Sequence, residues 1–496
     1  MCNRRCEDAC TRGRVDAAVA IDEVKKFIAQ RDLDAATRYV PPVVTPTRAG
    51  GFDQKIAIIG AGPAGLSCAF YLAEKGYKPV VFEKNERPGG MLTYGIPSFK
   101  LQKDVIEAEV EVIRLMGAEF RYGVEVGRDV TLDELRAQGF KAFYVAIGCQ
   151  GGRLVGIPGE DAEDVTVAVD FLREVNSGKI DALPGRTIVV GGGNVAIDVA
   201  RNACRLGSEH VEMFCLESEA QMPASEEERR EAIEDGAHIS CGWGPKEVHL
   251  DDAGRVCGIT FKRCTRVFDD EGRFAPEYDE NDLRRVDADR VVMSIGQSIV
   301  WGDLLAGSKV ELGRGQGALA DPQTYQTAEP DIFVGGDVYT GPSFAIDAIA
   351  AGHEAAVSIH RFVQPGSTLT IGRNQRHYTA LDRDDVVIES YDNASREVAH
   401  VDREREKAAP FSEYVETFTE EQVRAETARC LGCGASIVDP NKCIGCGLCT
   451  TKCAFDAIHL ERDRPECSTM VKYEQKLPSL GKYALKRAIK IKFGRK

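Results

Sequence analysis

The sequence predicts an α/β protein built on two doubly wound, Rossmann-like domains, with a small cysteine-bearing segment at each end. Three observations lead to this class. Short apolar runs alternate with helical patterns from Lys55 to about Ala350, as in parallel sheets that are covered by helices. Two strand-to-helix turns in this stretch are rich in glycine, and they start at Gly60 and Gly191. Near the C-terminus, from Cys443 onward, four cysteines stand at intervals that suit no ordinary core.

Bulk properties limit the kind of protein. A chain of 496 residues can hold three or four domains, and its 43% hydrophobic and 28% charged residues are ordinary for a globular protein. A net charge of −15 argues against nucleic acid, whose phosphates would repel the chain. The chain has 17 cysteines, but no apolar signal segment follows Met1, and no apolar run approaches the ~18 residues that span a bilayer. We therefore expect thiols in a reducing compartment, the cytoplasm, and no transmembrane segment.

The first glycine-rich turn has the pattern of a dinucleotide site. An apolar strand precedes Gly60, Gly62 and Gly65, and a helix is expected to begin near Leu66. These glycines permit a tight turn and close approach of a pyrophosphate, while the helix N-terminus supplies free N–H groups. Glu83 ends the next strand, where a carboxylate can hold a ribose hydroxyl.

Two later segments are expected to complete this site. The turn from Pro88 to Pro97 includes Gly90, Gly95 and Ile96, and would let a flat ring lie against backbone. Asp337 ends a strand and precedes a helical run, so it is expected to bond a sugar-alcohol chain while the helix start faces a phosphate. The local signals leave open the alternative that Asp337 is only a helix cap.

The second turn predicts a nicotinamide nucleotide site. Gly191, Gly193, Asn194 and Val195 form its strand-to-helix turn. The strand that follows ends in carboxylates and carries no base, whereas NADP binding favours an arginine at the 2′-phosphate. We therefore expect NADH rather than NADPH, with Glu217 accepting from the free ribose hydroxyl. A solvated loop acid is the alternative role for Glu217.

The C-terminal cysteine run predicts iron–sulfur clusters. Spacings of two, two and three residues let thiolates converge on one 4Fe–4S cube, while the fourth cysteine usually points at a second cluster. We expect one or two clusters, with Cys453 either completing the first or joining the second. Zinc at Cys430 and Cys433 is an alternative, because CxxC also suits tetrahedral thiolate sites. The candidate ligands are Cys443, Cys446, Cys449, Cys453, Cys430, Cys433 and Cys467.

Composition changes predict six segments along the chain. These are a partial N-terminal iron–sulfur helical module and linker (1–50), a first nucleotide-binding domain (51–165 and 320–363), a second one inserted in it (166–319), a loop-rich connector (364–422), a 4Fe–4S ferredoxin-like domain (423–467) and a basic tail (468–496).

Several motifs together carry a family resemblance. They are Cys2-x3-Cys6-Glu7-x2-Cys10, Gly60-x-Gly62-x2-Gly65, Gly89-Gly90 with Gly95-Ile96-Pro97, Gly191-Gly192-Gly193-Asn194, Met222-Pro223-Ala224 and Gly335-Gly336-Asp337. On these motifs, residues 2–360 resemble the small subunit of glutamate synthase and the related large subunit of NADH-dependent ferredoxin:NADP oxidoreductase. The resemblance implies FAD in the first site, a nicotinamide cofactor in the second, and iron–sulfur clusters at the N-terminal end.

Three departures from that family matter. Its NADPH-binding members typically carry an arginine pair where this chain has Leu216 and Glu217. The family's N-terminal module is longer, so Cys2, Cys6 and Cys10 make an incomplete cluster site. Its missing ligands are expected from a partner polypeptide or from residues before a misplaced start. The C-terminal ferredoxin-like segment is an addition that resembles versions of the family that feed multi-subunit redox complexes.

The basic tail is expected to form an amphipathic helix, with Leu480, Ala484, Ala488 and Ile491 on one face. Such a helix suits an acidic partner or an anionic membrane surface, and a solvated tail is the alternative.

These features predict an NADH-dependent subunit that passes electrons through FAD to 4Fe–4S clusters and on to a partner subunit or a ferredoxin. No acid or base is needed for the hydride step, so no catalytic residue is assigned. Whether the flavin bifurcates is left open. A glutamate synthase small subunit, or a non-catalytic electron-wiring or scaffold subunit, is the alternative.

Overall fold

The computed structural model describes two compact units, which are treated separately. The first comprises Met1–Ile371 and Val386–Leu431, and the second Gly372–Asp385 and Gly432–Lys496. The described residues are 3–43, 51–371, 373, 382, 386, 388, 391–433, 438, 442–452, 458–460 and 472–493.

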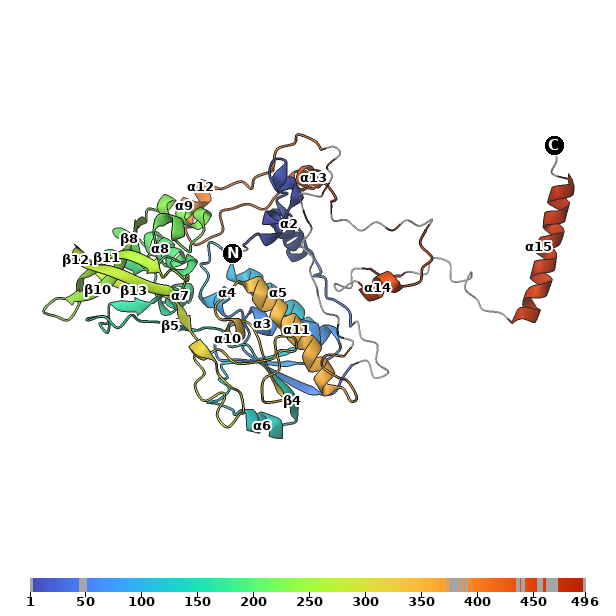
Figure 1. Cartoon of the computed structure of the whole chain (residues 1–496), viewed down its shortest axis with the longest axis horizontal. Coiled ribbons are helices and arrows are strands. Elements are labelled where there is room, and N and C mark those ends of the chain that lie inside the picture. The colour runs from blue at the N-terminus through green and yellow to red at the C-terminus, as the bar shows by residue number, and fades with distance from the viewer. Residues whose placement is uncertain are drawn as a thin grey trace. The chain divides into compact units, whose positions relative to one another are not determined.

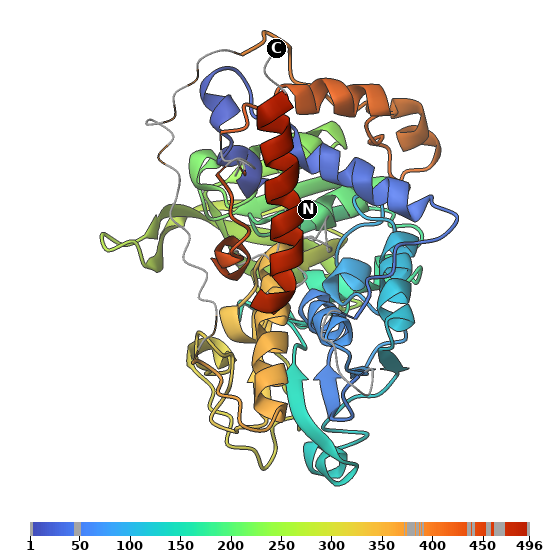
Figure 2. The ribbon, with the colours of Figure 1, turned by 90° about the vertical axis from the view of Figure 1, so that its right-hand side faces the viewer.

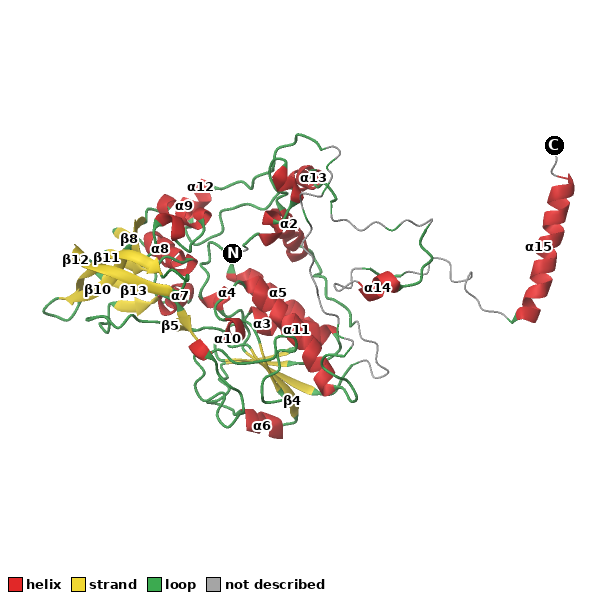
Figure 3. Ribbon diagram, in the orientation of Figure 1, coloured by secondary structure: helices red, strands yellow, loops and turns green. Residues whose placement is uncertain are grey.

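The first unit contains a parallel sheet that is seen at the label β4 in Figures 1 and 3. It has five strands, in the order β15-β4-β1-β2-β3. Successive residues of β1 point to opposite faces, because side chains alternate along a strand. Ile56 and Ile58 pack on one face beneath two helices, while Ala57 and Ile59 pack on the other. The strands are β1 (Lys55–Ile59), β2 (Val80–Glu83), β3 (Glu119–Tyr122), β4 (Phe140–Val145) and β15 (Ile332–Val334).

Two helices lie side by side on one face of this sheet: α3 (Pro63–Glu74) and α11 (Ala345–Val363) (Figure 1). They approach so closely that a Cβ at Gly352 would stand 2.2 Å from the carbonyl oxygen of Ala64. Helix α3 starts earlier than the predicted position near Leu66, because proline is well suited to the first position of a helix. The other helices of this domain are α4 (Met91–Tyr94), α5 (Lys103–Leu115), α6 (Leu132–Ala137) and α10 (Asp337–Thr340).

The second parallel sheet has the order β6-β13-β7-β8-β9. Val189 of β7 packs towards helices on one face, whereas Ile188 and Val190 pack on the other against an antiparallel sheet. The strands are β6 (Val165–Val167), β7 (Arg186–Val190), β8 (His210–Cys215), β9 (His238–Cys241) and β13 (Arg290–Met293), and the helices are α7 (Ala168–Asn176), α8 (Asn194–Arg205) and α9 (Glu226–Glu234).

The antiparallel sheet, of order β10-β11-β12, corrects the expectation of unbroken strand–helix alternation up to Ala350. Its strands are joined by short turns and cover a sheet face that a helix would otherwise occupy. The two parallel sheets with their helices confirm the predicted α/β, doubly wound class. The added strands are β10 (Trp243–Leu250), β11 (Val256–Phe268) and β12 (Phe274–Val286), and β5 (Gly151–Gly152) pairs separately with β14 (Gln297–Ser298).

The N-terminal residues and residues 391–431 fold together in the first unit. The N-terminal elements are α1 (Arg5–Asp8) and α2 (Ile21–Leu33), with a 3-10 turn at Thr11–Arg14 between them. The stretch expected to be a loop-rich connector contains α12 (Arg403–Ala408) and the start of α13 (Glu420–Ala428).

Figure 2 gives a second view of the ribbon, in which α15 (Tyr473–Phe493) is seen as one continuous helix of the second unit. The second unit also contains α14 (Leu448–Lys452). In the part of the chain that the structure describes, none of the helices combines the length and the hydrophobicity that a membrane span requires.

Candidate functional site

Three glycine turns of the first domain meet at the N-terminus of α3. The N–H of Gly89 donates to the carbonyl oxygen of Ala61 at 2.8 Å, and a Cβ at Gly90 would lie 2.9 Å from Gly62 Cα. Gly336 faces the same helix start, since its added Cβ would lie 3.0 Å from Ala64 Cβ. Gly90 and Gly336 have φ values of 54° and 66°, which favour glycine. The result is a concave surface of backbone, which is what a diphosphate at a helix N-terminus requires.

The predicted glycines of this turn have different roles in the packing. A Cβ at Gly65 would stand 1.9 Å from the carbonyl oxygen of Gly60, and one at Gly60 would stand 2.4 Å from that of Ala146. In contrast, a Cβ at Gly62 would meet nothing of the chain nearer than Gly90 Cα at 4.0 Å. Gly60 and Gly65 therefore hold helix to strand, while Gly62 leaves open space for a ligand.

Glu83 is buried at the end of β2 and is held in place by backbone donors. Its Oε2 accepts from the N–H of Ala61 at 2.8 Å, and its Oε1 accepts from the N–H of Asn85 at 2.9 Å. Oε1 also accepts from Asn85 Nδ2 at 2.7 Å, so Oε2 is the oxygen that keeps a free lone pair for a ribose hydroxyl.

The loop that is expected to face the flat ring is held by a residue that the sequence analysis missed. Lys103 donates from Nζ to the carbonyl oxygen of Leu92 at 2.9 Å and to that of Ile96. Gly95 is buried here against Met91, and Ile96 is half-buried. Burial lowers the pKa of Lys103 to about 8, with help from the charge of Arg87. The only sequence signal for Lys103 is its place at the start of α5, just after this loop.

Asp337 opens α10, beside the glycine pair that precedes it. Its Oδ1 accepts from the N–H of Ser343 at 3.3 Å, and burial raises its pKa above the ordinary value. The N-cap of α10 is Gly336 and that of α11 is Phe344, so Asp337 occupies neither capping position. This arrangement leaves the carboxylate able to contact a polar ligand group at the glycine cradle.

The second turn has the same construction. A Cβ at Gly191, where φ is 145°, would stand 2.2 Å from the carbonyl oxygen of Ser294, whereas a Cβ at Gly193 would meet nothing within 4 Å. Asn194 is exposed at the start of α8, and its Oδ1 accepts from the N–H of Ser225 at 3.2 Å. Val195 is half-buried and packs on the core beneath α8, which suits a packing role better than a ligand contact.

Glu217 follows β8 and faces the glycine turn, since its Oε2 would lie 2.9 Å from a Cβ at Gly192. Its backbone carbonyl accepts from the N–H of Gly242 at 2.9 Å, which fixes the loop. No hydrogen bond or ion pair to the Glu217 carboxylate is present among the described residues. The carboxylate is thus available at the edge where the adenosine ribose is expected.

Two thiols lie beside this turn. Cys215 and Cys241 end the paired strands β8 and β9, and their Sγ atoms are 3.7 Å apart. Burial, together with the neighbouring Cys241, raises the pKa of Cys215 far above its ordinary value. The Cys215 thiol therefore stays protonated and is a poor nucleophile at neutral pH.

The N-terminal cysteine segment lies next to the segment that ends at Cys430. Arg12 donates from Nη1 to the carbonyl oxygen of Arg429 at 3.0 Å, and Arg429 donates from Nη2 to that of Ala17 at 2.6 Å. Cys10 is two residues before Arg12, and Cys430 directly follows Arg429. Cys6 and Cys430 are exposed and Cys10 is half-buried, so the thiols lie at the surface of this junction. Cys2 lies outside the described residues.

The second unit carries the main cysteine run. Cys443, Cys446 and Cys449 are exposed, as is Cys433. Gly445 and Gly447 lie between them with φ of 65° and 78°, which lets the chain turn sharply. Within the described ranges, no three Cys, His, Asp or Glu side chains are grouped closely enough to hold a metal. Cys453 and Cys467 lie outside the described residues.

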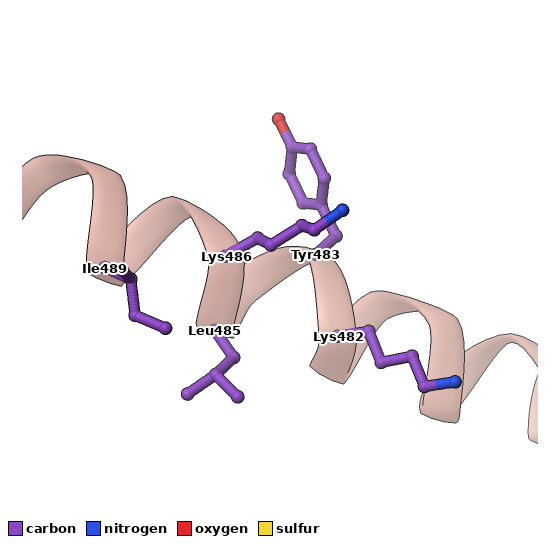
Figure 4. Close-up of a pocket in the computed structure, with 5 residues that line it drawn as sticks. All are labelled: Lys482, Tyr483, Leu485, Lys486 and Ile489. Carbon is purple, nitrogen blue, oxygen red and sulfur yellow. The ribbon is translucent and has the colours of Figure 1, made fainter.

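Helix α15 presents both apolar and basic side chains to solvent. Leu485 and Ile489 point to one side of the helix and Tyr483 to another, with Lys482 and Lys486 nearby (Figure 4). All five are exposed. The tail is thus helical over Tyr473–Phe493, while the apolar face of Leu480, Ala484, Ala488 and Ile491 stays a prediction.

Comparison with known proteins identifies the family. A family model described as pyridine nucleotide-disulphide oxidoreductase matches residues 54–352, and a 4Fe-4S binding domain model matches residues 436–459. In structure, FprA from Mycobacterium tuberculosis is similar with a TM-score of 0.54 and 19% identity, over 62% of this chain and 84% of FprA. That likeness supports the fold.

Two curated relatives show how far the similarity extends. The small chain of NADPH-dependent glutamate synthase from Escherichia coli K12 is 34% identical over 381 residues, which are 73% of this chain and 79% of the small chain. The β subunit of NADP(+)-dependent formate dehydrogenase from Moorella thermoacetica is 34% identical over 468 residues, which are 87% of this chain. This chain spans 64% of the length of that β subunit.

The glycine cradles and both family matches agree with the predicted redox chemistry. The chain belongs to the pyridine nucleotide-disulphide oxidoreductase family, together with the small chain of glutamate synthase, and is an FAD- and NAD(P)-dependent oxidoreductase with a 4Fe–4S ferredoxin-type segment.

Proposed function

We propose that this chain is a subunit that takes electrons from NADH through FAD to 4Fe–4S clusters and passes them to a partner subunit or a ferredoxin. The observation that carries the choice of NADH is the position of Glu217. Its carboxylate faces the second glycine turn, with Leu216 beside it and no arginine at either position. A carboxylate there accepts from a ribose hydroxyl and repels a 2′-phosphate.

The chain's own residues bind and orient the cofactors. The turn with Gly62 and the helix start of α3 would take the FAD diphosphate, and Glu83 would hold its ribose. Lys103 fixes the carbonyl groups of the loop that would lie against the flavin ring. When bound, the flavin supplies the exchange between hydride and single-electron chemistry, so the protein needs no acid or base for that step.

The junction of Arg12 and Arg429 supports a shared ligand set for one cluster. Cys6 and Cys10 come from the N-terminal side and Cys430 from the other. Together they would supply three of the four thiolates that one cube requires. Cys443, Cys446 and Cys449, with Cys453, would then hold a second cluster.

Partners are proposed from the relatives. Two are named as β subunits, one of formate dehydrogenase and one of an NADPH-Fe(3+) oxidoreductase from Geobacter sulfurreducens that is 29% identical over 472 residues. We infer that this chain likewise works beside other redox subunits, with the basic side chains of α15 suited to an acidic one.

A test uses the anaerobically purified native protein. NADH should bleach the flavin absorbance near stoichiometrically and reduce the clusters, whereas NADPH should act at least about tenfold less efficiently, a difference of ~1.4 kcal/mol. Equal efficiency of the two nucleotides would contradict the role of Glu217. Absence of both flavin and acid-labile sulfide would contradict the whole proposal.

A glutamate synthase small subunit is the second candidate, because 34% identity extends over 79% of such a chain. Co-purification with a large glutamine-hydrolysing subunit would favour it over the first candidate.

A further inference from the structure

The boundary between the two nucleotide-binding domains contains a largely buried charge cluster. Lys100 Nζ lies 2.6 Å from Asp198 Oδ1 and also contacts Glu228 Oε2, and the three side chains are only 12%, 14% and 15% exposed. Lys100 follows the predicted flavin loop by three residues, and Asp198 is one helical turn beyond Asn194. The cluster therefore joins the flavin loop directly to the helix of the nicotinamide turn.

Phe99, which directly precedes Lys100, also contacts the second nucleotide-binding domain. The buried ring of Phe99 contacts two guanidinium groups of α8, with centroid distances of 4.8 Å to Arg201 and 4.2 Å to Arg205. Asp235 holds both arginines, at 2.7 Å and 2.8 Å. A cation that lies over an aromatic face is attracted to the ring, so Phe99 is held by these cation–π contacts as well as by packing.

A third contact and an outer segment bind the same two domains. Asn176 Nδ2, at the end of α7, donates to the carbonyl oxygen of Tyr94 in the flavin loop at 3.1 Å. The segment after α12 contacts both sides, because Arg205 donates to the carbonyl oxygen of Pro410 at 2.6 Å and Gln102 donates to that of Phe411 at 3.3 Å. These contacts all surround the loop from residue 94 to residue 102.

Separating the two domains would break the contacts of Lys100 with Asp198 and Glu228, which is energetically unfavourable. A lysine ammonium is rarely buried unless paired, and the carboxylates of Asp198 and Glu228 would lose their counter-charge. Burial raises the pKa of Asp198, and the ammonium group of Lys100 opposes that rise. The domain orientation is thus fixed by the loop itself.

We propose that Phe99 and Lys100 are positioning residues that hold the nicotinamide domain in the orientation required for hydride transfer to the flavin. This inference rests on the proposed function. The two side chains act through the orientation of the domains and are not catalytic residues. Hydride transfer demands reacting atoms within about 3–3.5 Å, so a small rotation of one domain would slow it strongly.

The test is rapid anaerobic mixing of the full-length, FAD-loaded protein with NADH. Lys100→Met should lower the limiting rate of flavin reduction about ten- to a hundredfold, because misplacement by about 1 Å can have an effect of that size. The dissociation constant of NAD⁺, measured on the oxidised protein, should change little, because the glycine turn is intact. Lys100→Arg keeps the cation and should restore most of the rate. The matched control is Lys262→Met, which breaks an ion pair with Glu280 inside one domain.

Hydrogen exchange gives a readout that does not depend on activity. With FAD bound, Lys100→Met should raise exchange in residues 94–102 and 194–205, while Lys262→Met should not. If Lys100→Met fails to retain FAD, Glu228→Gln, which removes one of the two carboxylates, is measured in the same way.

Each outcome decides the proposal. An unchanged reduction rate and unchanged exchange in the variants would overturn it, as would a rate loss that Lys100→Arg fails to rescue. A wild-type protein that neither NADH nor NADPH reduces would contradict the proposed function instead. The exchange measurement would then still show whether Lys100 fixes the domains.

Discussion

Arg12 and Arg429 stand 417 residues apart in the sequence, yet Arg12 Nη1 donates to the carbonyl oxygen of Arg429 at 3.0 Å. Both guanidinium groups are almost fully buried. Glu426, also buried, pairs with Arg429 Nη1 at 2.6 Å and accepts from the N–H of Ala20 at 2.8 Å. A charge network thus joins the first cysteine motif of the chain to the segment that ends in Cys430.

This network makes a stability prediction. Arg429→Met would leave Glu426 buried without its cation, so the free energy of unfolding should fall by about 3–5 kcal/mol. Arg424→Met on the same helix breaks an exposed pair with Glu420 and should cost less than ~1 kcal/mol. Denaturant unfolding of both variants checks the contrast. If Arg429→Met lowers the free energy of unfolding as little as Arg424→Met does, the network does not stabilise the fold.

A shared cluster predicts how cysteine variants combine. Cys10→Ser and Cys430→Ser should each remove the same cluster, about four irons per chain, because one cube needs all its thiolates. The double variant should lose no more iron than either single variant. Iron content and electron paramagnetic resonance after anaerobic purification test this, with Cys257→Ser in β11 as the control. Additive losses would mean that the two cysteines serve different clusters.

The glycine cradle predicts that two neighbouring substitutions behave differently. Gly65→Ala places a Cβ 1.9 Å from the carbonyl oxygen of Gly60, so it should destabilise the protein by about 1–3 kcal/mol even without FAD. Gly62→Ala meets no chain atom nearer than 4.0 Å, so it should leave apoprotein stability nearly unchanged but weaken FAD binding. Thermal unfolding of the apoprotein and FAD titration separate the two effects. Full FAD affinity in Gly62→Ala would argue against a diphosphate at this turn.

Nucleotide preference should respond to charge at the end of β8. The double change Leu216→Arg with Glu217→Arg supplies cations for a 2′-phosphate, and each charge-assisted hydrogen bond contributes about 1.5–3 kcal/mol. The ratio of kcat/KM for NADPH over NADH should therefore rise at least about tenfold. Glu209→Arg adds a cation just before the other end of the same strand, and should leave the ratio unchanged. No shift in the double variant would show that this loop does not contact the ribose.

Lys103 predicts a pH dependence of stability. Burial lowers its pKa from 10.5 to about 8, so between these values the unfolded chain binds the proton more strongly than the folded protein. The free energy of unfolding should therefore rise from pH 8 to pH 10.5 by about 3 kcal/mol relative to Lys103→Met, since each pKa unit corresponds to ~1.4 kcal/mol. Below pH 8 the difference between the two proteins should be constant. Denaturant unfolding across this range checks it, and a flat difference throughout would contradict the assignment.

Local patterns were sufficient for much of the fold. The strand predicted directly before Gly60 ends at Ile59, and the next strand ends at Glu83 as predicted, because short apolar runs specify buried strands directly. The antiparallel sheet was missed, since its long, charged strands lack the strict alternation that marks a half-buried strand. Helix α3 begins at Pro63 and not near Leu66 as predicted, because proline is favoured at the first position of a helix.

The sequence by itself determined the α/β class, the two nucleotide turns and the cysteine run, because each depends on residues within about thirty positions of one another. Only the tertiary structure decided that the Cys10 segment lies against Arg429, and that Lys100 faces Asp198. Both contacts depend on buried charges finding partners from distant parts of the chain. The spacing of residues along the sequence does not predict which distant charges pair. The pairing arises in the folded protein, because an unpaired charge that is removed from water is unfavourable.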